Sequence, residues 1–137
     1  MHQPATPIAW LTTSINSSRE HGLANRCRTP NLRGPENERV MFGRAQMAWL
    51  EEALKSSSAV FKIIVSGNQM MNPLTPFEAW GTFPAEQRSF IEFLGREKIT
   101  GVLFLSGDRH HAELVRRIET GVYPLYDFTS SPLTSTG

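Results

Sequence analysis

The sequence predicts an α/β fold in which a mixed β-sheet is flanked by helices. Two stretches with helical periodicity, residues 43–55 and 84–95, alternate with two short apolar runs typical of buried strands, residues 60–65 and 102–106. Strands separated by helices favour a sheet with at least one parallel pair and with helices on its face. At 137 residues the chain can bury one core but is too short for two ordinary domains.

Residues 1–40 lack any sustained period and are rich in Pro, Ser, Thr, Asn and Arg. We expect them to form mainly loop, with a short strand or a helical turn around Ile8 to Leu11. So long an irregular stretch is unusual in a compact domain, and it makes better sense if it wraps a surface that other residues provide. We therefore divide the chain into an irregular N-terminal segment, residues 1–40, and a main part, residues 41–137.

The main part opens with a helix that is predicted to begin at Gly43 and to end near Lys55. Its apolar face repeats at spacings of three and four, at Ala45, Met47, Ala48, Trp49, Leu50, Ala53 and Leu54. The apolar run at 60–65 is predicted to be a buried strand, which breaks at Ser66-Gly67-Asn68-Gln69.

The next segment, residues 70–83, is predicted to be a loop long enough to act as a wall or lid. A second helix begins with Pro84 in its first turn and ends at Gly95. Its apolar face is formed by Phe90, Ile91, Phe93 and Leu94. After the strand at 102–106, we expect a hairpin of residues 112–118 and 122–128 that turns at Glu119-Thr120-Gly121.

Bulk composition argues against several classes of partner. Fourteen basic and thirteen acidic residues leave the net charge near zero, so neither a nucleic acid nor a membrane surface is expected as a stable partner. No apolar run approaches the roughly 20 residues of a transmembrane segment, and the N-terminus lacks the pattern of a signal peptide. The single cysteine, Cys27, excludes an internal disulfide; it could be a metal thiolate, a reactive thiol or an inert small residue.

The segment most informative about function is Ser106-Gly107-Asp108-Arg109-His110-His111-Ala112-Glu113, which follows an apolar run. A buried strand that breaks at a glycine and then presents a carboxylate and two imidazoles places metal ligands at a sheet edge. If residues 108–110 stay extended, Asp108 and His110 point the same way and His111 points opposite. The alternative is a solvated loop whose histidines have no function.

A second polar strand end, Gly67-Asn68-Gln69, is expected to lie beside this one, because ligands of open α/β sheets bind beyond the carboxyl ends of the strands. An amide oxygen of Asn68 or Gln69 can complete an oxygen-rich coordination shell, although such a pair can also form a plain turn. Arg109 can hold an anionic substrate through a bidentate fork, or it can be a solvated charge.

Metal-assisted hydrolysis is the reaction that these residue types fit. Adjacent cations polarise a phosphoryl oxygen and lower the pKa of a bridging water. Such a centre needs roughly six to eight protein donors. The chain offers about half of them, at Asp108, His110, His111, Asn68, Gln69 and Cys27. A serine hydrolase is poorly supported, because the chain has no G-x-S-x-G nucleophile elbow.

Several spaced motifs resemble one family. The run Met41-Phe42-Gly43-Arg44-Ala45-Gln46-Met47-Ala48-Trp49-Leu50-Glu51-Glu52-Ala53-Leu54 resembles the LG-x-x-Q-x-x-WL-x-x-x-L helix of PhoD-like alkaline phosphatases, a branch of the calcineurin-like metallophosphoesterases. Residues 61–69, 83–94, 101–114 and 123–134 follow that family in order. The resemblance runs from about residue 22 to the end of the chain.

The resemblance implies a four-layer αββα sandwich, of which residues 41–137 would be the C-terminal half. Gly107-Asp108-Arg109-His110 stands where the superfamily has Gly-His-x-His, which implies that Asp108 and His110 hold metal. Asn68 or Gln69 stands where a superfamily histidine ends the preceding strand. The segment Asn25-Arg26-Cys27-Arg28 is similar to a phosphate-contacting region of the family but lacks its acidic residue.

By the same resemblance, the function is that of a metal-dependent phosphoric ester hydrolase of the alkaline phosphatase D type, acting on a phosphomonoester or phosphodiester. His110, His111 and Arg109 are the candidate catalytic residues, with Arg109 or His111 orienting phosphate or donating a proton. The implied cofactors are iron and calcium ions, with zinc or manganese possible. The family's first half carries further metal ligands, which this sequence does not include, so we expect a fragment. The alternative is a non-catalytic piece that serves in binding or assembly. Members of the family are often exported to the periplasm or outside the cell.

Overall fold

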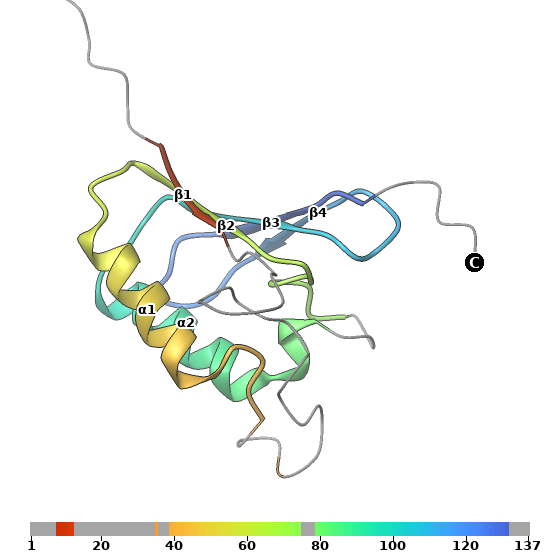
Figure 1. Cartoon of the computed structure of the whole chain (residues 1–137), viewed down its shortest axis with the longest axis horizontal. Coiled ribbons are helices and arrows are strands. Elements are labelled where there is room, and N and C mark those ends of the chain that lie inside the picture. Colours follow the sequence, from red (N-terminus) through yellow and green to blue (C-terminus); the bar gives the residue numbers. More distant parts are fainter. Residues whose placement is uncertain (1–7, 13–34, 36–38, 75–78, 132–137) are drawn as a thin grey trace, which may run out of the picture.

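The computed structural model describes residues 8–12, 35, 39–74 and 79–131, with residues 8–12 described by their backbone alone. Along the chain its elements are β1 (Ile8–Thr12), α1 (Gly43–Ser56), β2 (Phe61–Val65), the 3₁₀ turn η2 (Trp80–Thr82), α2 (Pro84–Arg96), β3 (Val102–Ser106), β4 (Glu113–Arg117) and β5 (Leu125–Thr129). The strands form one sheet in the order β1-β2-β3-β5-β4, in which β1, β2, β3 and β5 are parallel and β4 is antiparallel to β5 (Figure 1). The predicted mixed sheet is confirmed.

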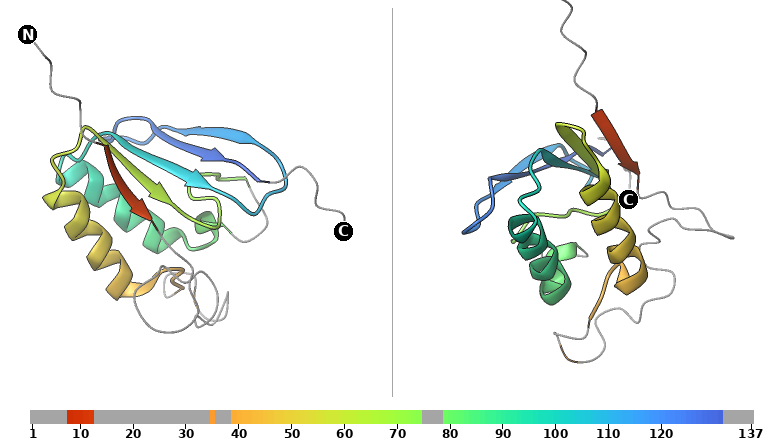
Figure 2. Two further views of the ribbon diagram at one scale, coloured as in Figure 1. Left: turned by 45° about the horizontal axis from the view of Figure 1, so that its top comes forward. Right: turned by 90° about the vertical axis from the view of Figure 1, so that its left-hand side faces the viewer.

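Both helices lie on the same face of this sheet, as the two views of Figure 2 show. Alternate residues of β2, β3 and β5 point toward the helices, and Ile64, Phe104 and Leu125 are completely or almost completely buried there. The helices contribute the other half of the core, from Leu50, Leu54, Phe90, Phe93 and Leu94. This burial of apolar surface is the main force that holds the helix layer to the sheet.

The loop predicted at residues 70–83 contributes apolar side chains to this core where the structure describes it. Trp80 is completely buried; it contacts Phe42 edge-on and Phe90 in a tilted arrangement, with ring centroids 5.3 Å away in each case. Met70 and Met71 are also completely buried. Burial of these large apolar side chains is favourable, and it holds this part of the loop against the helices.

The hairpin forms as predicted but with shorter strands. Gly121 adopts a positive φ of 82° at the turn, and Pro124 has no N–H for the ladder, so β5 begins at Leu125. Between them the Tyr123 hydroxyl accepts a hydrogen bond from Val102 N at 2.7 Å and donates one to Val102 O at 3.3 Å. Burial raises the pKa of Tyr123 to about 12, so its hydroxyl stays a donor.

Helix α1 is capped by a side chain from the first turn of α2. Glu86 Oε1 accepts a hydrogen bond from Gly43 N at 2.8 Å, and Oε2 accepts from Met41 N, Phe42 N and Trp80 Nε1 at 2.9, 3.2 and 2.9 Å. The first N–H groups of a helix have no partner within the helix, and a carboxylate satisfies them well. Glu86 therefore fixes the start of α1 against α2.

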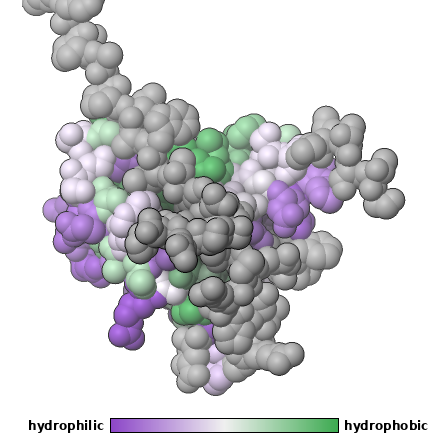
Figure 3. Space-filling model, in the orientation of Figure 1, coloured by the Kyte–Doolittle hydropathy of each residue, from purple (hydrophilic) through white to green (hydrophobic). Residues whose placement is uncertain are grey.

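The sheet face turned away from the helices is apolar and only partly covered. Phe61, Leu114 and Phe128 expose 46%, 64% and 45% of their surface, and the half-buried residues Ile63, Val65, Leu103, Leu105 and Tyr126 share this face. In the view of Figure 3, apolar surface lies along the top of the molecule, where the sheet is. Contiguous apolar surface of this kind marks an interaction face.

Candidate metal and phosphate site

The loops that follow β2, β3 and β5 meet at the carboxyl edge of the sheet. Ser66 N donates to Leu105 O and Ser130 N donates to Ser106 O, each at 2.9 Å. Gly107 sits at the junction, where an added Cβ would lie 3.5 Å from Gly67 O and 3.9 Å from Ser130 O. The expectation that the two polar strand ends lie side by side is confirmed.

Asp108 and His110 are both exposed on the loop after β3, and both have left-handed backbone, with φ of 66° and 56°. Residues 108–110 are therefore not extended, and the alternation of side chains that an extended backbone would give does not apply here. The chain turns because its backbone is bonded elsewhere: Arg109 N donates to Ser131 Oγ at 3.1 Å, and Arg109 O lies 2.8 Å from His111 Nδ1. Asp is among the residues that tolerate this conformation best.

His111 is half-exposed and directs both ring nitrogens toward protein oxygens. Nδ1 faces Arg109 O at 2.8 Å, and Nε2 lies 3.4 Å from Glu113 Oε2. The ring is thus engaged by its own loop and by β4. These contacts hold the loop, and a metal that bound the ring would have to displace one of the two oxygens.

Glu113, the first residue of β4, lies at the centre of the polar contacts between the loops. Its Oε2 accepts from Gln69 Nε2 at 2.7 Å and from Asn72 Nδ2 at 3.2 Å. The hydrogen bond from Gln69, together with His111 and Asn72, lowers the pKa of Glu113 against the opposing effect of burial. Glu113 was not predicted from the sequence as a site residue.

The two amide residues after β2 are both buried but differ in their contacts. Gln69 is completely buried; its Nε2 also donates to Thr129 Oγ1 at 2.9 Å, and its Oε1 accepts from Asn72 Nδ2 at 3.3 Å. Asn68 is 5% exposed, and its backbone N donates to Ser66 Oγ at 3.3 Å. The Gln69 amide is therefore engaged by protein partners from β4, β5 and its own loop.

A second carboxylate that the sequence reading missed anchors the same loop from within the core. Asp127 is completely buried, and its Oδ2 accepts from Met70 N at 2.7 Å and Met71 N at 2.9 Å. Its Oδ1 accepts from Ser106 Oγ at 2.7 Å. The available signal was an acidic residue inside the apolar strand 125–129, since a buried carboxylate needs hydrogen-bond donors around it.

The structure brings the predicted residues to one sheet edge but does not gather a complete ligand set. Within the described ranges, no three His, Cys, Asp or Glu side chains are close enough together to hold one ion. Arg109 is half-buried in the same loop as Asp108. Cys27 and the Asn25-Arg26-Cys27-Arg28 segment lie outside the described residues.

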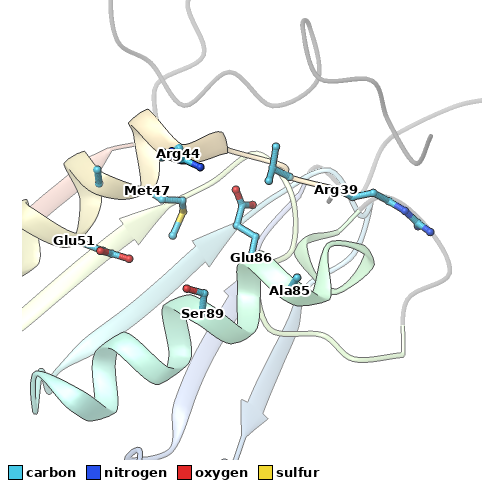
Figure 4. A pocket seen from close by; sticks show the side chains of 9 residues that line it. Arg39, Arg44, Met47, Glu51, Ala85, Glu86 and Ser89 are labelled. Carbon is cyan, nitrogen blue, oxygen red and sulfur yellow. The ribbon is translucent and has the colours of Figure 1, made fainter. Parts of the chain in front are cut away.

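A separate hollow of about 390 Å³ lies between the N-terminal ends of α1 and α2 (Figure 4). Arg39, Arg44, Glu51 and Ser89 contribute to its lining, and Glu86 points from α2 toward the start of α1. The Glu86 carboxylate is already engaged by four protein donors, so its role there is to cap the helix. None of the lining residues belongs to the predicted metal site.

No helix in the described part of the chain is both long and apolar enough to cross a membrane. For the residues that the structure does not describe, the absence of a transmembrane segment remains a prediction from the sequence.

Comparison with known proteins places this site in a family. A solved structure described as that of PhoD matches with a TM-score of 0.62 at 20% sequence identity, which shows a shared fold. The match covers 93% of this chain and 27% of that one, so the chain spans about a quarter of the length of that relative. No curated protein matches. The family model for PhoD-like phosphatases matches residues 13–137, a longer stretch than the motifs from about residue 22 indicate. Since that model spans most of the sequence, this chain belongs to the PhoD-like phosphatase family.

Proposed function

We propose that this chain carries part of the catalytic site of a metal-dependent phosphoric ester hydrolase that acts on a phosphomonoester or phosphodiester. The observation that carries the proposal is the meeting of the two polar loops at Gly107, in a chain of the PhoD-like phosphatase family. Asp108 and His110 belong to one of these loops, and Asn68 and Gln69 belong to the other. In open α/β sheets, ligands bind at this edge.

The donors at this edge suit a hard cation. Asp108 offers carboxylate oxygens, His110 an imidazole nitrogen, and Asn68 or Gln69 an amide oxygen; Asp108 and His110 are exposed. Iron and calcium are the ions that the family resemblance implies, with zinc or manganese as alternatives. When bound, such an ion polarises the phosphoryl oxygen as a Lewis acid. Three donors are about half of a coordination shell, so the others would come from residues beyond those described.

The remaining loop residues would act on the substrate directly. Arg109 leaves the same loop as Asp108, and a guanidinium matches two phosphate oxygens at once. His111, which is half-exposed and contacts Arg109 O, would donate a proton to the leaving group or orient the phosphate. Gln69, with its amide engaged by Glu113 and Thr129, would hold the loop of Asn68 in place.

The alternative is a non-catalytic role in binding or assembly for the 137-residue chain by itself. The apolar sheet face with Phe61, Leu114 and Phe128 supports it, because in a four-layer αββα sandwich this face would pack against a second sheet. The PhoD structure, of which the chain covers 27%, is long enough to contain such a second sheet.

Hydrolysis of p-nitrophenyl phosphate and bis(p-nitrophenyl) phosphate, with added iron, calcium, zinc or manganese, tests the proposal. We expect metal-dependent turnover by the protein that the gene encodes. Asp108→Ala should lower kcat/KM by at least about 100-fold, because even an outer partner of a ligand is worth about 10–100-fold. Glu52→Ala, at an exposed position of α1, is the control and should retain full activity.

Two outcomes separate the candidates. Unchanged turnover in Asp108→Ala would rule out the ligand role, and turnover that does not depend on metal would rule out the proposed reaction. Robust metal-dependent hydrolysis by the 137-residue chain alone would refute the assembly role.

A further inference from the structure

We propose that Glu113 is a positioning residue, which locks the Asp108–His110 loop to the loop after β2 and so sets the geometry of the metal donors. Its catalytic consequence rests on the proposed function, whereas its effect on the loop does not. Neither the family match nor the motifs assign a role to Glu113.

The loop that Glu113 would hold is strained. Asp108 and His110 both adopt left-handed backbone within three residues, at φ of 66° and 56°. Residues other than glycine remain in this region only where their surroundings hold them, and such positions concentrate at functional sites. The same two residues are the proposed metal ligands, so the strain lies where preorganisation of a metal site would require it.

The described contacts that hold the loop lead to two anchors. Arg109 N donates to Ser131 Oγ at 3.1 Å, which ties the loop to the end of β5. His111 Nδ1 lies 2.8 Å from Arg109 O, and the other side of its ring faces Glu113 Oε2 at 3.4 Å. The imidazole of His111 thus connects the strained turn to the carboxylate of Glu113.

Glu113 can serve as an anchor because it is itself fixed. As the first residue of β4 it pairs with Thr129 of β5, and its Oε2 accepts from Gln69 Nε2 at 2.7 Å and Asn72 Nδ2 at 3.2 Å. The position of Gln69 is determined in turn by its burial and its bond to Thr129 Oγ1. One carboxylate oxygen therefore joins the loop of Asp108 and His110 to the loop of Asn68.

The test compares Glu113→Ala and Glu113→Gln with Glu119→Ala. Glu119 is a matched control because its side chain is 38% exposed against 37% for Glu113, and it also pairs with a residue two positions away, Arg117 at 2.7 Å. Dissociation constants for Mn²⁺ alone, the ¹⁵N shifts of the His111 ring, and kcat and KM for p-nitrophenyl phosphate are measured in each variant.

We expect Glu113→Ala to weaken Mn²⁺ binding about tenfold and to lower kcat about tenfold with KM nearly unchanged. The His111 ring signals should move, and Glu113→Gln, which keeps one acceptor oxygen, should recover part of each effect. Glu119→Ala should match the wild type in all three measurements.

Failure of this inference can be told apart from failure of the proposed function. If the wild type hydrolyses the ester with metal but Glu113→Ala keeps its kcat and its Mn²⁺ affinity, the positioning role is wrong. If the wild type shows no metal-dependent hydrolysis, the proposed function fails; unmoved His111 ring signals in Glu113→Ala would then also overturn the positioning role.

Discussion

Two carboxylates, Asp127 and Glu113, determine how the loops of the candidate site are held. Asp127 bonds two consecutive backbone N–H groups of the loop after β2, and Glu113 bonds the side chains of that loop. These hydrogen bonds are charge-assisted, and a charge-assisted bond is about twice as strong as a neutral one. They are also stronger in a site of low dielectric constant than at the exposed surface. These residues give the site its rigidity although they were not among its predicted ligands.

At the residue scale, the lowered pKa of Glu113 predicts a specific dependence of stability on pH. Because the folded-state pKa lies below the ordinary value of 4.5, ionised Glu113 contributes stability above pH 4.5, and that contribution is lost as the pH falls through the lowered pKa. Glu113→Gln should therefore have a lower urea midpoint than the wild type at about pH 7, and the difference should be smaller at an acid pH below 4.5. An equal difference at both pH values would contradict the assignment.

The residue types at the site could be read from the sequence, but their directions could not. Asp108 and His110 follow a buried strand as predicted, yet the turn between them reverses the backbone. That turn depends on the contact between His111 and Glu113 and on the hydrogen bond from Arg109 N to Ser131 Oγ. Ser131 lies more than twenty positions from Arg109 in the sequence. Local alternation carries no information about such partners.

At the element scale, the periodicities of both helices and of β2 and β3 gave their positions to within one or two residues. The helices pack on one side of the sheet, and apolar residues that repeat at helical spacing are buried there. The hairpin strands were predicted too long because Pro124 interrupts the second strand and Tyr123 bonds to β3 instead. The cap of α1 by Glu86 could not be read locally, since the two lie more than forty residues apart.

The junction before β3 offers a test of how tightly the elements are packed. Gly101 has a φ of 75°, and an added Cβ would lie 1.8 Å from Val60 O, whereas Gly121 has a φ of 82° with open space around it. We expect Gly101→Ala to lower the free energy of unfolding by about 3 kcal/mol, from both clash and backbone strain. Gly121→Ala should cost about 1 kcal/mol, from strain alone. Chemical denaturation of the two variants measures this; equal losses would mean that the close approach of Val60 is not a constraint.

At the scale of the whole molecule, the sheet has one face covered by helices and one apolar face that is partly open. The sequence motifs indicated half of a larger sandwich, and the PhoD structure, of which this chain covers 27%, has the same fold in the matched part. The metal donors that we propose at the carboxyl edge would likewise make up about half of a coordination shell. The sequence could not give the partners of Gln69 and His111, because these depend on which loops a folded sheet brings together.

The central claim is that the carboxyl edge around Gly107 binds a metal ion, and paramagnetic broadening by Mn²⁺ tests it most directly. In ¹H–¹⁵N spectra of the protein titrated with low Mn²⁺, the signals of residues 107–111 and of Asn68 should broaden first, and Asp108→Ala should abolish this selectivity. If the first signals to broaden belong to the acidic pair of α1, the half-buried Glu51 and the exposed Glu52, or if Asp108→Ala leaves the pattern unchanged, the metal site is not where we place it.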